Sequence, residues 1–494
     1  MKKVRTRFAP SPTGYLHIGS LRTILFAYLI SKSQDGDFLL RIEDTDQKRY
    51  VKGSVEKLIE ILNWLGIKYD EGPEIGGDYG PYIQSERQDI YDKYIKKLLE
   101  KGEAYHCFCS AERLTELREA QQKDKLPPRY DRACRGLSRE KVEKRIQAGE
   151  KYTIRQKMPL EGEIKVHDEL RGDIIFKAAE LEDHVLIKSN GIPTYQFASV
   201  VDDHLMEISH VTRAEEWIPS FPKNVLLYKA FNWEIPKFIH LPVVLNKGGG
   251  KLSKRQGDVT VEDFKNKGYL RQALINFNVL LGWSPYDKDK KNDKNVEILS
   301  LDEVTQIFDY KKINTSPAVF DQDKLDFFNA HYIKALNDDD LLKNCLPYLK
   351  TYLEEKNINI KNFDKNFLLK VVRVEKERMK KLSEIGEMTE FFFLDKLELD
   401  KEMLAWKKIT KDDAQVNLKK LIVVLEKISE NDWNKEHLET TIIEYLKTNE
   451  YKIGEYLWPM RVSLCARKNS PGPFEIAEIL GKNKSINRIK EASK

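Results

Sequence analysis

Apolar and polar positions along the first 66 residues follow two different periods. Short apolar runs over residues 4–9 and 38–42 predict strands, whereas residues 21–31 and 53–65 carry apolar positions at the helical period. Gly66 marks the end of the second predicted helix. Strands that alternate with helices in this way predict a parallel sheet flanked by helices.

The alternation of predicted strands and helices changes between about residue 105 and residue 186. The segment contains three cysteines, a basic helical stretch and short β-like runs such as YTIRQKM and GDIIFK. It predicts an α+β insertion, because the α/β signals resume at His184 and continue through FIHLPVVL to about Leu245. The charged residues 286–296, YDKDKKNDKNV, predict a solvated loop without a function of its own.

From residue 334 onward, apolar residues recur at helical spacing in a lysine-rich background, as in NFLLKVVRVEKERMKKLSEI and DAQVNLKKLIVVLEKISE. This pattern predicts an all-α domain. The predicted boundaries place an α/β domain at 1–104 and 184–250, the insertion at 105–183, a connecting region at 251–333 and the all-α domain at 334–494.

Composition narrows the class of protein. A chain of 494 residues exceeds one hydrophobic core, so two to four domains are expected. Lys and Arg total 84 against 79 Asp and Glu, and the net charge of +5 favours a nucleic-acid partner only if basic residues cluster locally. The first residues lack the apolar stretch and small-residue cleavage site of a signal peptide, and no run approaches the roughly 20 apolar residues that span a bilayer. Five cysteines without the spacing of a disulfide framework predict a reducing cytoplasm.

The stretch RFAPSPTGYLHIGS (residues 7–20) places rigid backbone and one histidine directly before the first predicted helix. Two prolines restrict the backbone and Gly14 permits a turn. Gly19 and Ser20 lie where the helix begins, and a helix N-terminus presents unpaired N–H groups that favour a phosphate. Taken alone, the stretch fits a strand–turn–helix with a surface histidine better than a phosphate site.

A second stretch, GGGKLSKR (residues 248–255), combines three glycines with three cations. It is not a P-loop, because Leu252 separates the Gly-Lys pair from Ser253. Such a loop can close over a polyphosphate and neutralise the charge that grows as pyrophosphate departs. A flexible basic surface loop is the simpler interpretation of this stretch alone.

Together the two stretches resemble the HIGH and KMSKS signatures of class I aminoacyl-tRNA synthetases. In that class, as here, the two signatures lie on either side of an insertion. The words APSPTG, RIEDTD, YQFASVVDDHLM and RAEEW narrow the resemblance to bacterial-type glutamyl-tRNA synthetases, over essentially the whole chain. The family implies a Rossmann-like catalytic domain, an inserted acceptor-binding subdomain, and an all-α stem-contact and anticodon-binding region. The fourth HIGH position is Ser20 and the last KMSKS position is Arg255, as is usual in this branch.

The resemblance implies a ligase that joins L-glutamate to tRNA(Glu). ATP and glutamate would form glutamyl adenylate and diphosphate, and the glutamyl group would then pass to the 2′-hydroxyl of the terminal adenosine with release of AMP. Similar enzymes generally need tRNA for the first step. Mg²⁺ would share the charge of the departing diphosphate. The family is mostly monomeric, and the sequence leaves open whether tRNA(Gln) is also charged.

The resemblance assigns catalytic roles to three residues. His17 would hold the ATP phosphates, and Lys254, supported by Lys251, would stabilise the departing diphosphate. The residues predicted to bind ATP are His17, Gly19, Ser20, Glu216, Trp217, Val243, Val244 and Lys254. Of these, Val243 and Val244 would flank the adenine.

Glutamate has two carboxylates and one ammonium, so its site needs two cationic or donor groups and one anion. Arg7 and Arg213 can supply forked donors to the carboxylates, and Glu43 can pair the ammonium. Ser11 and Tyr195 add hydroxyl groups. Each residue taken singly also fits an ordinary structural role. The sequence motifs that match the family favour the glutamate site.

Cys107, Cys109 and Cys134 follow the spacing of a zinc site seen in some family members, with 24 residues between the second and third cysteines. The fourth ligand of that site, a histidine, is Gly136 here. Structural zinc normally takes four ligands, so we expect a metal-free remnant, although His106 or Tyr130 could substitute.

A tRNA partner requires local basic surfaces. The basic residues 129–155 of the insertion would meet the acceptor end, and helices beyond Lys334 would read the anticodon. Arg378 is the predicted reader of the third anticodon base, and a solvated arginine on a helix face is an equally good interpretation.

Three other functions compete with this one. A glutaminyl-tRNA synthetase typically carries Pro-Glu-Pro-Asn-Gly where residues 10–14 are Pro-Ser-Pro-Thr-Gly, and its C-terminal part is a β-barrel. A truncated paralogue that glutamylates a modified tRNA base lacks the helical C-terminal domain. A tRNA-binding protein with an inactive synthetase fold would not need His17, Lys251, Lys254 and Glu43.

Overall fold

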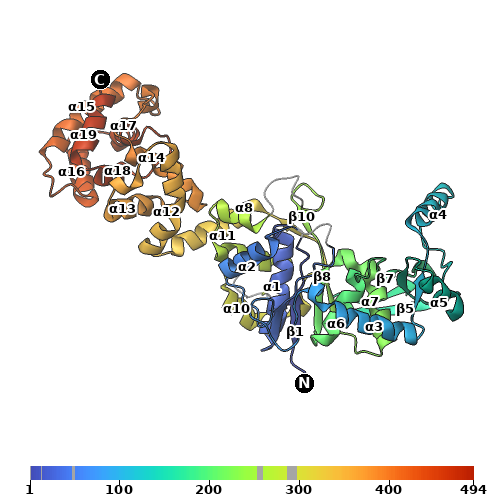
Figure 1. The fold of residues 1–494 in the computed structure, drawn as a ribbon. Helices are drawn as coiled ribbons and strands as arrows, with labels where there is room; N and C mark the ends of the chain where they lie inside the picture. Colours follow the sequence, from blue (N-terminus) through green and yellow to red (C-terminus); the bar gives the residue numbers. More distant parts are fainter. Residues whose placement is uncertain (1, 13, 47–50, 253–259, 286–296) are drawn as a thin grey trace. The chain divides into compact units, whose positions relative to one another are not determined.

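The computed structural model describes residues 2–12, 14–46, 51–252, 260–285 and 297–494. The chain folds as two compact units, Met1–Phe264 with Leu274–Gln322 and Lys265–Ala273 with Asp323–Lys494. Figure 1 shows their elements, coloured along the chain. None of the helices in these ranges is long and apolar enough to cross a membrane. The charged residues 286–296 lie outside the described part of the chain.

The first unit mixes strands and helices. Its strands are β1 (Arg5–Phe8), β2 (Asp37–Leu40), β3 (Ala104–Cys107), β4 (Thr153–Gln156), β5 (Glu163–Asp168), β6 (Gly172–Lys177), β7 (Val185–Ile187), β8 (His210–Ala214), β9 (Lys237–Leu241), β10 (Val244–Asn246) and β11 (Ala318–Phe320). Its helices are α1 (Ile18–Lys32), α2 (Ser54–Leu65), α3 (Gln88–Glu100), α4 (Ala111–Lys123), α5 (Arg139–Gln147), α6 (Tyr195–Leu205), α7 (Phe221–Phe231) and α10 (Leu301–Ile307), while α8 (Val261–Asn266) and α9 (Arg271–Leu280) contain residues of both units.

The predicted strand–helix–strand–helix opening is confirmed. β1 and β2 pair in parallel, in register from Arg5 opposite Asp37 to Phe8 opposite Leu40. α1 is buried along most of its length, as expected of a helix that is apolar on nearly all sides. Gly66 ends α2 with a φ of 77°, a left-handed conformation that a residue without a Cβ adopts at little cost.

The largest sheet joins strands that are far apart in sequence, in the order β6-β5-β9-β8. β8 and β9 pair in parallel with Arg213 opposite His240, and β5 joins the other edge of β9 in parallel through Asp168. Ser209, directly before β8, donates its main-chain N–H to the Arg5 carbonyl at 2.9 Å, so the entry of β8 meets β1. These parallel pairs confirm the predicted α/β class.

The segment predicted as an insertion contains helices and strands, as expected of an α+β subdomain. α4 and α5 bury none of their side chains, and β3, β4 and β7 form an antiparallel sheet. Strand pairing crosses the C-terminal end of the predicted range 105–183, because β7 pairs with β4 and β9 pairs with β5. Pairing of this kind depends on contacts in space and leaves no trace in a local sequence pattern.

The described residues of the second unit form helices joined by turns, which confirms the predicted all-α region. These helices are α11 (Gln322–Ala335), α12 (Asp338–Glu355), α13 (Lys365–Glu375), α14 (Ile385–Phe393), α15 (Lys411–Lys427), α16 (Lys435–Thr448), α17 (Ile453–Cys465), α18 (Pro473–Leu480) and α19 (Lys482–Ala492). In α12 the buried residues Leu342, Cys345, Leu349 and Leu353 recur at three- and four-residue steps, which places them on one face toward a shared apolar core.

Candidate active site

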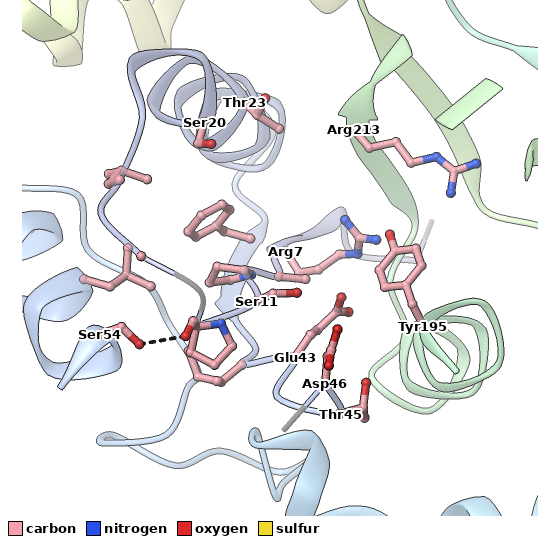
Figure 2. A pocket seen from close by; sticks show the side chains of 18 of the residues that line it. Arg7, Ser11, Ser20, Thr23, Glu43, Thr45, Asp46, Ser54, Tyr195 and Arg213 are labelled. Carbon is pink, nitrogen blue, oxygen red and sulfur yellow. Dashed lines mark hydrogen bonds between the residues drawn. The ribbon is translucent and has the colours of Figure 1, made fainter. Parts of the chain in front are cut away.

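A cavity of about 810 Å³ lies among the end of β1, the turn that leads into α1, the segment after β2, the start of α6 and β8. Figure 2 shows many of the side chains that line it. Of the predicted ATP-binding residues, Ser20 and Trp217 also line this cavity. Its size suits a small molecule. The predicted glutamate-binding residues all line it: Arg7, Ser11, Glu43, Tyr195 and Arg213.

Arg7, on β1, is anchored by a buried carboxylate that it shares. Its Nε and Nη2 donate to Asp203 Oδ1 and Oδ2 at 2.8 and 3.1 Å, and Arg41 Nη1 donates to the same Oδ1 at 2.8 Å. Burial alone would raise the pKa of Asp203, but Arg7 and Arg41 together lower it below its usual value. Because Arg41 also pairs with Glu43, the two arginines and the two carboxylates form one buried network at this edge of the cavity.

Glu43 has one paired carboxylate oxygen and one that is not paired. Oε1 accepts from Arg41 Nη2 at 2.9 Å and from Arg41 Nε at 3.3 Å. Oε2 is buried and has no hydrogen-bond partner among the described residues. Burial raises the pKa of Glu43 to about 7, against the opposing effect of Arg41 and Arg7. In Figure 2 the Glu43 carboxylate points toward Arg7, and Oε2 offers an acceptor to an ammonium group in the cavity.

Arg213, on β8, has only neutral hydrogen-bond partners among the described residues. Its Nε donates to His240 Nε2 at 2.9 Å and its Nη1 donates to Asn224 Oδ1 at 3.0 Å. Nη2 is buried without a partner in the same set, and burial lowers the pKa of Arg213. A buried arginine without an acid partner leaves uncompensated positive charge beside the cavity. A carboxylate in the cavity would compensate it.

Aromatic rings and one further cation complete the lining. Tyr195, the first residue of α6, and Trp217, in the short 3-10 turn Glu215–Ser220, have ring centroids 4.6 Å apart. Lys188 lines the cavity and donates from Nζ to the Thr45 carbonyl at 3.1 Å. The sequence reasoning did not single out Lys188, because one lysine after a short strand carries no distinguishing pattern.

His17 caps the N-terminus of α1 and pairs with the segment that follows the second motif stretch. Its Nδ1 accepts from the Gly19 N–H at 3.1 Å, so the N–H that the resemblance assigns to ATP phosphates contacts the histidine here. His17 forms an antiparallel bridge with Thr260, and the Val261 N–H donates to the Leu16 carbonyl at 2.9 Å. Thr260 follows the KLSKR stretch, so stretches more than 200 residues apart in sequence meet in the fold.

Lys251 is the predicted catalytic lysine that the structure describes, whereas Lys254 lies outside the described residues. The Lys251 Nζ lies 2.5 Å from Glu216 Oε1, and the two side chains are 58% and 52% exposed. Glu216 is itself a predicted ATP-binding residue next to Trp217 in sequence. The contact places a predicted catalytic cation beside Glu216, whose neighbour in sequence, Trp217, lines the cavity.

The predicted adenine-flanking residues lie at the start of β10. The Val243 N–H donates to Glu215 Oε1 at 2.9 Å, and the Val244 carbonyl accepts from the Leu252 N–H at 3.0 Å. Val244 is buried. These contacts connect the backbone beside the predicted adenine site to the start of the basic loop.

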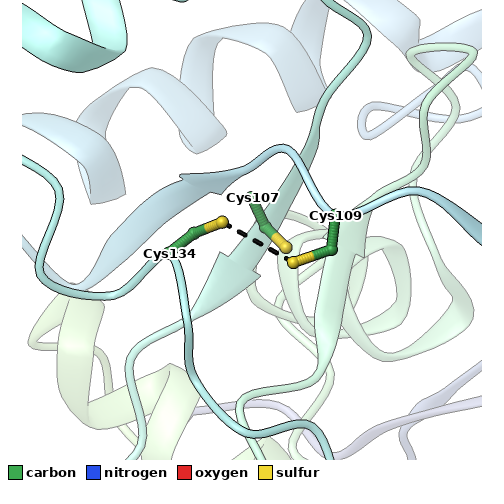
Figure 3. A group of neighbouring side chains, drawn as sticks. All are labelled: Cys107, Cys109 and Cys134. Carbon is green, nitrogen blue, oxygen red and sulfur yellow. Dashed lines mark hydrogen bonds between the residues drawn. The ribbon is translucent and has the colours of Figure 1, made fainter. Parts of the chain in front are cut away.

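The three cysteines of the insertion lie together, as Figure 3 shows. Their sulfur atoms all lie within 4.8 Å of one another, and the Tyr130 hydroxyl lies 3.2 Å from Cys107 Sγ and 3.7 Å from Cys109 Sγ. Three thiols and a phenol place four donor atoms in one small volume, and such a group could hold a metal ion. This geometry does not test the expectation of a metal-free cluster, which stays a prediction.

Arg378 lies just after α13 in the second unit. Its Nη1 donates to Glu375 Oε2 at 2.6 Å, and its side chain is 35% exposed. Burial raises the pKa of Glu375 to about 7, against the opposing effect of Arg378. The arginine is therefore paired and partly accessible, and its role in reading a tRNA base stays a prediction.

Several buried polar residues around the cavity were missed at the sequence level. Arg41 and Asp203 lie inside the matched words RIEDTD and YQFASVVDDHLM, and His240 lies in FIHLPVVL. The available signal was a charged or polar residue within an otherwise apolar element. That signal does not reveal which partner each residue contacts.

Residues 3–327 match the family described as tRNA synthetases class I (E and Q), catalytic domain, and residues 340–493 match the family described as anticodon binding domain. The glutamate–tRNA ligase of Clostridium tetani (strain Massachusetts / E88) is 46% identical over 492 residues, which cover 99% of this chain and 97% of that protein. The glutamate–tRNA ligase of Clostridium botulinum (strain Eklund 17B / Type B) is 44% identical over 494 residues, covering 99% and 98%.

A solved structure is also similar over the whole chain. It is the crystal structure of a glutamate tRNA ligase from Elizabethkingia meningosepticum in complex with its amino acid, with a TM-score of 0.88 and 36% identity. The similarity covers 100% of this chain and 99% of that chain.

Proposed function

The chain belongs to the class I tRNA synthetases for glutamate and glutamine, and we propose that it joins L-glutamate to tRNA(Glu) through glutamyl adenylate, releasing AMP and diphosphate. One observation carries the proposal. Glu43 Oε2 and Arg213 Nη2 belong to two buried groups of opposite charge that line one cavity, and neither atom has a hydrogen-bond partner among the described residues. They complement the ammonium and a carboxylate of an amino acid.

The charge of the cavity favours glutamate over a neutral amino acid. Arg213 has no acid partner among the described residues, whereas Arg7 and Arg41 are balanced by Asp203 and Glu43. A second carboxylate gains from this positive charge, whereas the neutral side-chain amide of glutamine does not. In this proposal Glu43 binds the ammonium, Arg7 and Arg213 bind the two carboxylates, and Ser11 and Tyr195 add hydroxyl groups.

In the first step, a carboxylate oxygen of glutamate attacks the α-phosphorus of ATP. The new oxygen–phosphorus bond forms as the bond to the diphosphate oxygen breaks, and the electron pair leaves with diphosphate. His17 and the N-terminus of α1 bind the phosphates in this proposal, and Lys251 and Lys254 stabilise the charge on the leaving group. Mg²⁺ bound to the phosphates would supply further neutralisation.

In the second step, the 2′-hydroxyl oxygen of the terminal adenosine attacks the glutamyl carbonyl carbon. The ester bond forms as the bond to the adenylate oxygen breaks, AMP leaves with the electron pair, and the hydroxyl group releases its proton. The basic residues 129–155 of the insertion contact the acceptor end in this proposal. The helices matched as an anticodon binding domain contact the anticodon.

The test is tRNA-dependent exchange of labelled pyrophosphate into ATP. We expect exchange with glutamate and tRNA(Glu), and none with glutamine. Glu43→Gln preserves the side-chain shape and removes the charge, so it should raise KM for glutamate about 100-fold with little change in KM for ATP. Exchange with glutamine alone, or none with glutamate, would overturn the proposal, and a protein that only binds tRNA would give none.

Finer parts of the proposal have separate tests. We propose that the protein is a monomer, which light scattering on the purified protein would test. We also propose that it is cytoplasmic, which fractionation of cells would test. Charging of purified tRNA(Glu) and tRNA(Gln) would show whether the second tRNA is also a substrate. Zinc has no part in the proposed reaction, and metal analysis tests the predicted metal-free cysteine cluster, since one zinc ion per chain would contradict it.

A further inference from the structure

A chain of three buried polar side chains crosses three neighbouring strands and ends at the cavity. Asp168 ends β5, His240 lies on β9 and Arg213 lies on β8. Asp168 and His240 are 0% exposed and Arg213 is 7% exposed. Asp168 Oδ2 lies 2.7 Å from His240 Nδ1, and His240 Nε2 lies 2.9 Å from Arg213 Nε. Of the three, Arg213 lines the cavity.

The hydrogen-bond chemistry fixes the protonation of His240. An arginine Nε can only donate, so His240 Nε2 must be the unprotonated acceptor. The ring proton therefore lies on Nδ1 and is donated to Asp168, which describes the neutral imidazole. Burial lowers the pKa of His240 and so favours this neutral form, against the opposing effect of Asp168. A protonated His240 would direct an N–H group at the N–H group of Arg213.

Asp168 is itself fixed in place. Its Oδ1 accepts from the main-chain N–H groups of Leu170 and Arg171, each at 3.0 Å. Its Oδ2 accepts from the His240 main-chain N–H at 3.0 Å in addition to the ring. The carboxylate therefore cannot turn away from Nδ1 without losing several bonds. This rigidity selects one tautomer of the histidine and one orientation of its ring.

At the other end of this series of hydrogen bonds, two protein acceptors set the direction of the Arg213 side chain. His240 accepts from Arg213 Nε, and Asn224, on α7, accepts from Nη1. Two of the three guanidinium nitrogens are thus engaged on the protein side. Nη2, which has no partner among the described residues, is left for the cavity.

We propose that His240, held by Asp168, is a positioning residue that orients Arg213 for a carboxylate of glutamate. The inference rests on the proposed function, in which Arg213 binds that carboxylate. Neither Asp168 nor His240 lines the cavity, so both act through the arginine. Asp168 lies on a strand inside the range predicted as the insertion, and the three residues therefore link that segment to the amino-acid site.

Two substitutions of His240 separate its two ring contacts. His240→Gln can place an amide oxygen near the Nε2 position and still accept from Arg213. His240→Asn can place an amide nitrogen near the Nδ1 position and donate to Asp168, but it leaves Arg213 Nε without its acceptor. We expect His240→Asn to raise KM for glutamate about 100-fold with little change in KM for ATP, and His240→Gln to recover most of that loss.

Asp168→Asn tests the hydrogen bond between Asp168 and His240. An amide at this position either donates to His240 Nδ1, which moves the ring proton to Nε2 and toward Arg213, or turns its N–H groups toward main-chain donors. We expect KM for glutamate to rise as in His240→Asn. Thermal unfolding of each variant shows whether the fold is retained.

His167 provides a matched control. Its Nδ1 lies 2.7 Å from Asp173 Oδ1 on the neighbouring strand, the same contact distance, but the two side chains are 63% and 45% exposed. His167→Asn should have the wild-type KM for glutamate.

Two results would overturn the positioning role. One is a wild-type KM for glutamate in His240→Asn. The other is an equal rise of KM for glutamate and ATP in both His240 variants with equal loss of thermal stability, which indicates a general structural role. A wild-type protein without glutamate-dependent exchange would instead reject the proposed function, so the two failures are distinguishable.

Discussion

The ammonium group of Lys251 lies 2.5 Å from the carboxylate oxygen Oε1 of Glu216. Both side chains are about half exposed, and an ion pair in such a position contributes little to stability because water screens it. In the proposed reaction, the triphosphate of ATP, which carries several negative charges, would displace Glu216 from the lysine. The weak pair holds the lysine beside Glu216, the neighbour in sequence of the cavity-lining Trp217.

Lys251→Ala should lower the rate of tRNA-dependent pyrophosphate exchange about 100-fold, because charge that develops on the departing diphosphate loses a cation. KM for glutamate should change little. Lys247→Ala is the control, since Lys247 is an exposed lysine in the same glycine-rich segment. An exchange rate in Lys251→Ala equal to that of Lys247→Ala would contradict a catalytic role for Lys251.

Glu43 predicts how activity depends on pH. Its pKa of about 7 lies above the usual range of a carboxyl group, so the side chain is protonated below neutral pH and loses the charge that pairs with an ammonium. We expect kcat/KM for glutamate to fall about tenfold for each pH unit below 7 and to level off above it. The decrease of kcat/KM below pH 7 should be absent in Glu43→Gln. A wild-type kcat/KM that does not change between about pH 5.5 and 8.5 would refute the role of Glu43 in this pH dependence.

Asp203 should be important for stability as well as for the site. Asp203→Asn leaves Arg7 and Arg41 buried without the charge that they share, and removal of one partner from a buried ion pair typically costs about 3–5 kcal/mol. Calorimetry should show a lower unfolding temperature for the first unit. Asp173→Asn removes an exposed, ion-paired carboxylate and should leave that temperature nearly unchanged. Equal shifts in the two variants would show that the buried network is not stabilising.

Arg378→Ala tests the predicted contact with the anticodon. We expect a higher KM for tRNA(Glu) and weaker discrimination against tRNAs that differ in the third anticodon base, because a side chain that stacks on or bonds to an unpaired base is lost. Arg373→Ala is the control, since Arg373 is a more exposed arginine on α13 with Asp338 as its ion-pair partner. Identical discrimination in both variants would remove Arg378 from the proposed interface.

The extent of successful prediction differs between local and non-local features. The helical period of residues 21–31 predicted α1, and the glycine at position 66 predicted the end of α2. The start of α1 was predicted to within one residue, since Gly19 and Ser20 were placed where the helix begins and α1 starts at Ile18, but the His17 cap was not predicted. A cap depends on the direction of one side chain, which periodicity does not contain.

The candidate site shows the same division. Arg7, Glu43 and Arg213 were found by matched words, and the structure places them around one cavity. Asp203, which neutralises part of the Arg7 charge, lies 196 residues away in sequence, and no local pattern joins the two. Which oxygen of Glu43 is unpaired also followed from the fold alone, because Arg41 approaches only Oε1.

The sequence by itself determined the order of strands and helices, the residue types available for glutamate and phosphate, and the resemblance that assigned their roles. It could do so because helix and strand periods, glycines and motif words are local properties. The tertiary structure alone decided that β5 pairs with β9, that His17 meets Thr260 and that Asp168, His240 and Arg213 form one buried chain. Hydrogen bonds and charge pairs depend on distance in space, and the fold sets those distances between residues that the chain keeps far apart.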